Sequence, residues 1–416
     1  MDRFSVYKHN FILPSGTLAR RQLIVIKHDN GTLTFTNFGK YITSKKAFTT
    51  PANDGGNQFA FVVQMLNFTF QNYNIRKLND LTVDMVNDFL QNYSLGTLDG
   101  DTQPRTKETV MMCSNAILNF LVNYIHDNKD KSAMKEADLY RKQPYKNKYN
   151  QVQERMVPVF DVICEGADKI ILRDIPNKAF ALLLNHIADE HPNLLGLVIL
   201  SAFAGLRPSE SCNVRREDSS LGPGIIINKT DGEITKIQID LRRELILRSD
   251  GKITGSIKKE RLQTVPSIFI SSFAEYYEKY LEYLKKQPYE EDYGALNINK
   301  QGKAMIYRSY FNAFKQIVKE EMVPIYLASD DPELVEFGRI LMEYDLAPHA
   351  LRHWYSVQLT LAGYTVPELM NARGDKSPES ALTYIQNKGE LEKQYAQASN
   401  KIFDYFSWLA EKTYGV

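Results

Sequence analysis

Four short polar clusters in the second half of the 416-residue sequence carry side chains that could take part in chemistry. A guanidinium group engages two oxygens at once, an imidazole moves protons near neutral pH, and a tyrosine hydroxyl can act as a nucleophile. Each cluster alone also has a simpler explanation, such as a structural ion pair between Arg207 and Glu210. The side chains in question are Arg207, Glu210, Lys258, Lys259, Arg261, His349, Arg352, Asp375 and Tyr384.

Local signals place these side chains at the ends of secondary-structure elements. In GLRPSE, Arg207 stands between a helix-ending glycine and a proline suited to the first position of the next helix, which predicts a helix junction. His349 and Arg352 are three residues apart and share one side of a predicted helix. The lysines belong to SIKKERLQTVP, the lip of a charged β-hairpin, and Tyr384 to a helix that opens at the Ser-Pro of DKSPES.

Other common site signatures are missing from the sequence. There is no GxGxxG, GxxxxGK[ST], HExxH or GxSxG. His349 and His353 are four residues apart, but no Glu or Cys stands where it would complete a metal site. Three widely spaced cysteines predict reduced thiols in a cytoplasmic protein. The charged N-terminus and the lack of any apolar run of about 18 residues predict a soluble protein without an export signal.

In their order and spacing the clusters resemble the catalytic domain of the tyrosine recombinases, also called the phage integrase family. GLRPSE at 205–210 matches the motif GLRxSE, and HALRH at 349–353 matches HxxRH. Tyr384 follows His349 by 35 residues, a separation typical of compact bacterial members. The resemblance covers roughly residues 56–400 and is strong in the catalytic motifs and loose elsewhere.

The resemblance implies a role for each motif residue. Arg207 and Arg352 would bind the scissile phosphate and stabilise the charge that develops on its oxygens. Tyr384 would be the nucleophile, and its 3′-phosphotyrosyl link would conserve the bond energy, so that no metal, ATP or other cofactor is needed. His349 would donate to the phosphate or manage the tyrosine proton, and Glu210 would orient Arg207 or His349.

The general acid remains open between two lysines. In this family a hairpin lysine protonates the leaving 5′ oxygen. Lys258 stands eight residues before Pro266, the usual distance to the residues that close the hairpin. Counting from Arg261 shifts the register and leaves Lys259 as a second candidate.

Asp375 departs from the family pattern, which has His or Trp nine residues before the nucleophile. A carboxylate there is expected to repel the phosphate. Either Lys376 or His353 takes over the position, or a partner rearranges this turn. Reduced intrinsic activity or a catalytically lapsed copy is the alternative, but the survival of the other motif positions together favours an active enzyme.

The predicted fold is multidomain, mainly α-helical with small β-sheets. Residues 1–55 form a basic β-rich module with a hairpin at Asn30-Gly31, equally compatible with DNA binding and with a simple edge hairpin. Residues 56–128 form a helical core-binding (SAM-like) DNA-binding domain, and 129–165 a basic linker. Residues 166–416 form the α+β tyrosine-recombinase catalytic domain, with a strand-rich insert and a C-terminal docking helix.

The net charge of +1 conceals strongly charged segments. Residues 1–55 carry a net +5, residues 129–150 a net +4 and residues 241–261 a net +4. Residues 330–345 carry a net −5. Because cations that neutralise phosphates release counterions, the basic segments are expected at DNA and the acidic one away from it.

The C-terminal helix carries an apolar stripe of Ile402, Phe403, Phe406 and Leu409. Such a stripe either packs on its own domain or docks into a neighbouring protomer, and we expect docking, in a homotetramer on two inverted-repeat core sites.

The predicted function is a cytoplasmic site-specific DNA recombinase, an integrase or transposase of a mobile element, acting on double-stranded DNA through a Holliday junction. An accessory excision or bending protein is a further expected partner. One alternative is a type IB topoisomerase, which uses a similar site as a monomer. The other is a catalytically impaired DNA-binding regulator on the same scaffold, motivated by Asp375.

Overall fold

The computed structural model describes residues 2–14, 18–42, 57–98, 103–146, 151–166, 174–287, 289, 294–375, 378 and 381. The chain divides into two compact units, residues 1–170 and 171–416. Helices predominate and the three sheets are small and antiparallel, as the sequence predicts. No helix among the described residues is long and apolar enough to cross a membrane.

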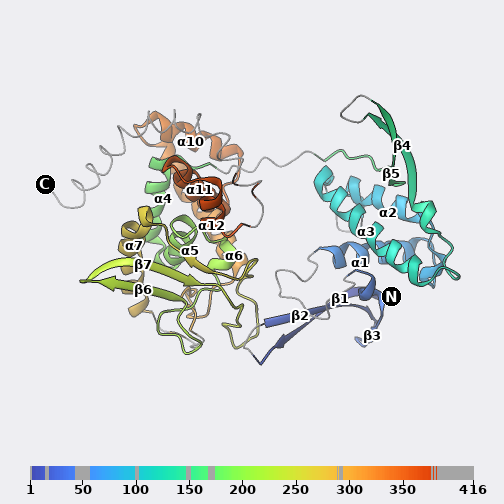
Figure 1. The fold of residues 1–416 in the computed structure, drawn as a ribbon, viewed down its shortest axis with the longest axis horizontal. Helices are drawn as coiled ribbons and strands as arrows, with labels where there is room; N and C mark the ends of the chain where they lie inside the picture. The colour runs from blue at the N-terminus through green and yellow to red at the C-terminus, as the bar shows by residue number, and fades with distance from the viewer. Residues whose placement is uncertain are drawn as a thin grey trace. The chain divides into compact units, whose positions relative to one another are not determined.

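The first unit combines a three-stranded sheet with a helical bundle (Figure 1). Its strands are β1 (Arg3–Ile12), β2 (Leu18–Lys27) and β3 (Leu33–Phe35), and its main helices are α1 (Gln58–Asn72), α2 (Val83–Leu95) and α3 (Lys107–Asp127). The predicted hairpin is present between β2 and β3, where Gly31 has a φ of +82°, a conformation that glycine adopts without strain. Thr82 and Thr106 cap α2 and α3 by accepting a backbone N–H with the side chain.

The sheet and the bundle share one hydrophobic core. Phe4 of β1 and Ile24 of β2 are buried in the same cluster as Phe59 of α1 and Phe89 of α2. Asn67 of α1 joins the elements further, since its side chain accepts from the Phe4 N–H at 2.8 Å and donates to the Phe4 carbonyl at 3.0 Å. Strands β1 and β2 therefore contribute to the bundle's core, so the predicted basic β-rich module and the predicted helical domain share one core.

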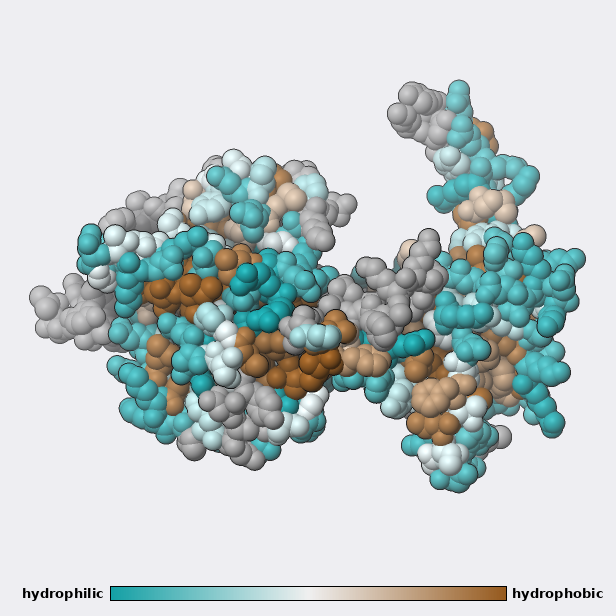
Figure 2. Space-filling model, turned by 60° about the horizontal axis from the view of Figure 1, so that its bottom comes forward, coloured by the Kyte–Doolittle hydropathy of each residue, from teal (hydrophilic) through white to brown (hydrophobic). Residues whose placement is uncertain are grey.

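Residues 129–165, expected as a linker, contain folded structure. A 3-10 turn, η4 (Glu136–Leu139), leads into the antiparallel hairpin β4 (Tyr140–Lys146) and β5 (Val152–Pro158). Met134 and Leu139 are buried in the first unit's core, which anchors the base of the hairpin. Three of the basic residues of this segment, Arg141, Lys142 and Lys146, lie on β4, and Figure 2 shows mostly hydrophilic side chains along the projecting hairpin. Strand pairing explains how so polar a segment is ordered, because it satisfies the backbone groups.

The second unit is built around a helix buried on all sides. It contains the predicted strand-rich insert as β6 (Ile225–Thr230), β7 (Glu233–Asp240) and β8 (Leu262–Thr264), paired in that order. Every residue of α5 after Pro192 is buried, as expected for a helix whose sequence is apolar all round. The helices are α4 (Asn177–Glu190), α5 (Pro192–Ala202), α6 (Pro208–Ser211), α7 (Ser267–Lys285), α8 (Tyr307–Ile317), α9 (Val323–Leu327), α10 (Pro332–Glu343), α11 (His349–Leu361) and α12 (Val366–Arg373), with the π-helical turn η5 (Val318–Met322) between α8 and α9.

Candidate oxyanion site

Arg207 caps the N-terminus of the short helix α6, and the first turn of this helix fixes both Arg207 and Glu210. Gly205 has a φ of +64°, and a Cβ atom there would lie 2.3 Å from the Tyr355 ring, so the junction requires glycine. The Arg207 N–H donates to Glu210 Oε2 at 3.1 Å, and Arg207 Nη1 donates to Glu210 Oε1 at 3.1 Å. The ion pair that the spacing allows is therefore present, and it leaves Nη2 of Arg207 directed elsewhere.

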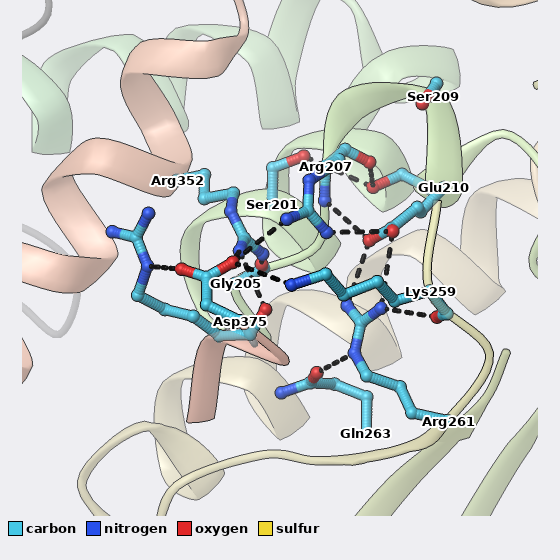
Figure 3. Close-up of polar contacts among 12 residues, drawn as sticks. Ser201, Gly205, Arg207, Ser209, Glu210, Lys259, Arg261, Gln263, Arg352 and Asp375 are labelled. Atoms are coloured by element: carbon cyan, nitrogen blue, oxygen red, sulfur yellow. Dashed lines mark hydrogen bonds and ion pairs between the residues drawn. The ribbon is translucent and has the colours of Figure 1, made fainter. Parts of the chain in front are cut away.

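Glu210 is fully buried and also binds a second arginine. Arg261, which follows the hairpin lip, donates from Nη2 to Glu210 Oε2 at 2.9 Å and from Nη1 to Oε1 at 3.3 Å. Burial raises the pKa of the Glu210 carboxyl, but the hydrogen bonds and charge of Arg261, together with the charge of Arg207, outweigh it and hold the pKa below its usual value. Glu210 therefore stays ionised and holds two guanidinium groups in fixed positions (Figure 3).

Arg352 reaches the same place from α11, which packs beside α5. It is almost completely buried, and it donates to the Gly205 carbonyl and, at 2.7 Å, to the Arg373 carbonyl. Burial, with the nearby charges of Arg207 and Arg373, lowers the pKa of Arg352 to about 9. The shift means that the cationic form of Arg352 is poorly compensated by the anions around it.

Asp375 lies where these guanidinium groups converge. Its Oδ1 accepts from Arg207 Nη2 at 3.0 Å and lies 3.4 Å from Arg352 Nη2, while its Oδ2 accepts from Arg373 Nε at 2.7 Å. Burial raises the pKa of the carboxyl, but the hydrogen bond and charge of Arg373 and the charges of Arg352 and Arg207 hold it below its usual value. Figure 3 shows the carboxylate among the arginine side chains. The Asp375 carboxylate, which the sequence predicts to repel a phosphate, is thus itself an anion bound by three arginines.

The two candidate lysines occupy different surroundings. Lys259 Nζ lies 3.9 Å from Asp375 Oδ1, and the Lys259 carbonyl accepts from Arg261. Lys258 is exposed, and within the described residues no hydrogen bond or ion pair links it to this cluster. The geometry thus brings Lys259, the second candidate, to the arginines.

The remaining motif residues either lie on α11 or fall outside the described residues. His349 is the first residue of α11, three positions before Arg352, and its side chain is exposed. His353 Nε2 lies 2.6 Å from Asp174 Oδ1, so the histidine that could replace Asp375 is held by another carboxylate. Tyr384, Lys376 and the C-terminal stripe at 402–409 lie outside the described residues.

Two arginines of the cluster have no role in the family motifs. Arg261 belongs to the charged hairpin lip noted in the sequence, and Arg373, which no motif indicates, is the last residue of α12. A local signal exists for the second, because Gly374 has a φ of +64° and ends α12 as a left-handed cap. A Cβ at Gly374 would lie 2.5 Å from Arg261 Nε, so this glycine lets the chain pass close to the guanidinium. That approach is a tertiary contact with no sequence signature.

The assembled cluster has a large excess of positive charge. It contains the cations Arg207, Lys259, Arg261, Arg352 and Arg373 and the carboxylates Glu210 and Asp375, an excess of three positive charges. Such crowding of like charges is costly without further anions. The cluster can therefore bind an oxyanion, and its guanidinium forks suit a tetrahedral phosphate.

No family model matches the sequence, and no curated protein matches it. Solved structures of recombinases and integrases do. The XerH site-specific recombinase bound to its difH substrate matches at 16% identity over 81% of this chain and 79% of that chain, with a TM-score of 0.44. The Tn1549 transposon integrase with transposon right end DNA matches at 15% identity over 83% and 92%, with a TM-score of 0.48.

A lambda integrase dimer bound to a core site matches at 11% identity over 79% of this chain and 88% of that chain, with a TM-score of 0.43. These proteins are tyrosine recombinases, the family that the sequence motifs resemble. The identities are low and the TM-scores lie below 0.5, so these matches carry no argument about function, which rests on the side chains of the cluster and on the sequence motifs.

Proposed function

We propose that the protein is a site-specific DNA recombinase, an integrase or transposase of a mobile element, that cleaves and rejoins double-stranded DNA through Tyr384. The observation that carries this proposal is the carboxylate of Asp375 bound by Arg207, Arg352 and Arg373. This contact supports a site in which converging guanidinium groups bind a small oxyanion. Two of these residues, Arg207 and Arg352, are also the arginines of the motifs GLRxSE and HxxRH.

In the proposed reaction the scissile phosphate takes the place that Asp375 holds in the structure. Arg207 and Arg352 each donate to its non-bridging oxygens, where negative charge grows in the transition state. The Tyr384 oxygen attacks phosphorus, a 3′-phosphotyrosyl bond forms, and the bond to the 5′ oxygen breaks. Lys259 gives that oxygen a proton, and His349 accepts the proton that the Tyr384 hydroxyl releases. One phosphodiester is exchanged for one phosphotyrosyl ester, so the step needs no ATP, metal or cofactor.

Rejoining is the same step in reverse with the 5′ hydroxyl of another strand. The first strand exchange forms a Holliday junction, and the second resolves it, so that two inverted-repeat core sites recombine. We place four protomers on the two sites, linked by exchange of the C-terminal helix at 402–409, with an accessory excision or bending protein as a further partner. Glu210 positions the site indirectly, since it holds Arg207 and Arg261 without contacting DNA.

Covalent capture tests this proposal and does not require a known target site. Nicked duplexes with a randomised centre are incubated with the full chain in the presence of a chelator, then denatured in detergent. We expect DNA to remain bound through a 3′ phosphate and a free 5′ hydroxyl to appear. Tyr384→Phe should retain no DNA after denaturation, because it lacks the nucleophile. An adduct that persists in this variant would overturn the role of Tyr384.

The position of Asp375 favours a second candidate, a DNA-binding regulator whose phosphate pocket is permanently closed. Selective binding of duplexes that never yields an adduct, in the wild type or in Asp375→Asn, would support the regulator and overturn the recombinase. Relaxation of supercoiled plasmids without any exchange between sites would instead identify a type IB topoisomerase.

A further inference from the structure

A second cluster of chemically active side chains lies in the larger unit and shares no residue with the oxyanion site. His186 lies four residues before the end of α4, and His191 stands at the boundary between α4 and α5. Glu321 belongs to the π-helical turn η5. These three residues come from segments separated by about 130 residues of chain. They form a cluster of two imidazoles and one carboxylate on a partly exposed surface.

The local backbone explains why the two histidines meet. Residues five apart on a regular α-helix point about 140° away from each other. At His191 the chain leaves the helix, with a φ of −129° and a ψ of 50°, before Pro192 begins α5. This break turns the ring of His191 back towards His186, and the ring centroids are 5.7 Å apart. Glu321 approaches from a widened helical turn, a feature often found at functional sites.

All three side chains converge on one point. His186 Nε2 lies 2.7 Å from Glu321 Oε2, and His191 Nε2 lies 2.8 Å from the same oxygen. The three potential ligand atoms lie within 4.8 Å of one another. Without a cation, both imidazoles must carry a proton on Nε2 to share this single oxygen. One cation in place of the two protons would satisfy both nitrogens and the carboxylate together.

We propose that His186, His191 and Glu321 form a binding site for a divalent transition metal, with zinc as the reference ion. Two imidazole nitrogens and one carboxylate oxygen are a zinc ligand set, with bonds of about 2.0–2.1 Å. Tetrahedral ligands at that distance are roughly 3.4 Å apart, so the cluster needs only small side-chain movements. The side chains remain 18%, 21% and 35% exposed, which leaves a fourth position open to water.

The proposed ion would act as a cross-link in the catalytic unit. It would fasten the junction between α4 and α5 to η5, and α5 is the buried helix that leads to Arg207. On binding, each neutral imidazole moves its proton from Nε2 to Nδ1, and a protonated imidazole releases one proton to solvent. The ion is held by the native fold and not by the unfolded chain, so binding stabilises the fold.

Zinc titration of the full chain tests the site. The tag-free protein is stripped with a chelator, dialysed, and titrated with zinc against a chromophoric competitor. We expect one zinc ion per chain, and at least about a hundredfold weaker binding in His186→Asn and in Glu321→Gln, because each variant loses a ligand atom and even the loss of a residue that only orients a ligand costs about 10–100-fold. The matched control is His126→Asn, which changes an exposed histidine of the first unit and should bind zinc like the wild type. Zinc should also raise the melting temperature of the wild type and the control only.

Equal affinity in the wild type, His186→Asn and Glu321→Gln would overturn the site, as would the absence of zinc binding by the wild type. Cobalt provides a readout on the wild-type chain, so that misfolded variants cannot obscure the result. Tetrahedral cobalt with nitrogen and oxygen ligands gives visible absorption without a thiolate charge-transfer band. A thiolate band would assign the ion to the exposed Cys164 and overturn the proposal.

Discussion

Substitution of Asp375 by asparagine separates two effects of the carboxylate: it stabilises the clustered arginines in the fold, and it competes with the phosphate for them. The carboxylate makes close contacts with three guanidinium groups, at 3.0 Å from Arg207, 3.4 Å from Arg352 and 2.7 Å from Arg373. In Asp375→Asn the amide oxygen can still accept one of these bonds, but the amide NH₂ faces a donor and the charge is gone. Without DNA, the arginines then repel one another with less compensation, and the free energy of unfolding should fall by about 3 kcal/mol.

The expected effect on cleavage has the opposite sign. A phosphate entering between Arg207 and Arg352 must displace the carboxylate and break its charge-assisted hydrogen bonds, each worth about 1.5–3 kcal/mol. In Asp375→Asn the phosphate no longer has to break one such charge-assisted hydrogen bond. The covalent adduct should therefore form about ten- to a hundredfold faster. The assay is single-turnover adduct formation on a captured nicked duplex, with unfolding by denaturant measured in parallel.

The matched control is Asp240→Asn. Asp240 is a carboxylate held by Arg215 at 2.9 Å and by Arg242 at 2.9 Å, away from the proposed phosphate position. This variant should lose a similar amount of stability and form the adduct at the wild-type rate. If folded Asp375→Asn forms the adduct more slowly than the wild type, Asp375 supports catalysis, and the expected competition between its carboxylate and the phosphate is refuted.

Three further expectations concern single residues of the site. Arg261→Ala should lower the free energy of unfolding by about 3 kcal/mol, because buried Glu210 loses a bidentate partner; an unchanged denaturation midpoint would contradict this. Lys259→Ala should slow cleavage by about a hundredfold. The rate should recover on a substrate with a 5′-bridging sulfur, because the sulfur leaves without a proton. Lys258→Ala should cleave at the wild-type rate, and the reverse pattern would assign the general acid to Lys258. The pKa of Arg352 is lowered to about 9 in the free protein, and a phosphate favours the charged form, so DNA binding should take up protons near pH 9 and not at pH 7. Calorimetry in buffers of different ionisation enthalpy measures this uptake, and its absence at pH 9 would contradict the placement of phosphate beside Arg352.

Short-range signals determined much of the local structure. Asn30-Gly31 specifies its hairpin, because a tight turn needs residues that tolerate a positive φ. Thr82 specifies the start of α2, because its side chain accepts an N–H that the helix leaves unpaired. Pro208 and Glu210 likewise specify the junction that presents Arg207. Each of these signals acts over a few residues, so the sequence alone contains it.

Only the tertiary structure decided which charges meet. Arg207 and Asp375 are 168 residues apart, and their contact depends on the packing of α11 against α5 and α12. The carboxylate that the sequence casts as a repulsive neighbour of phosphate is bound by arginines, because the balance of charge in a buried cluster is a property of all its members together. For the same reason the sequence leaves Lys258 and Lys259 open, while the fold brings Lys259 to 3.9 Å from Asp375.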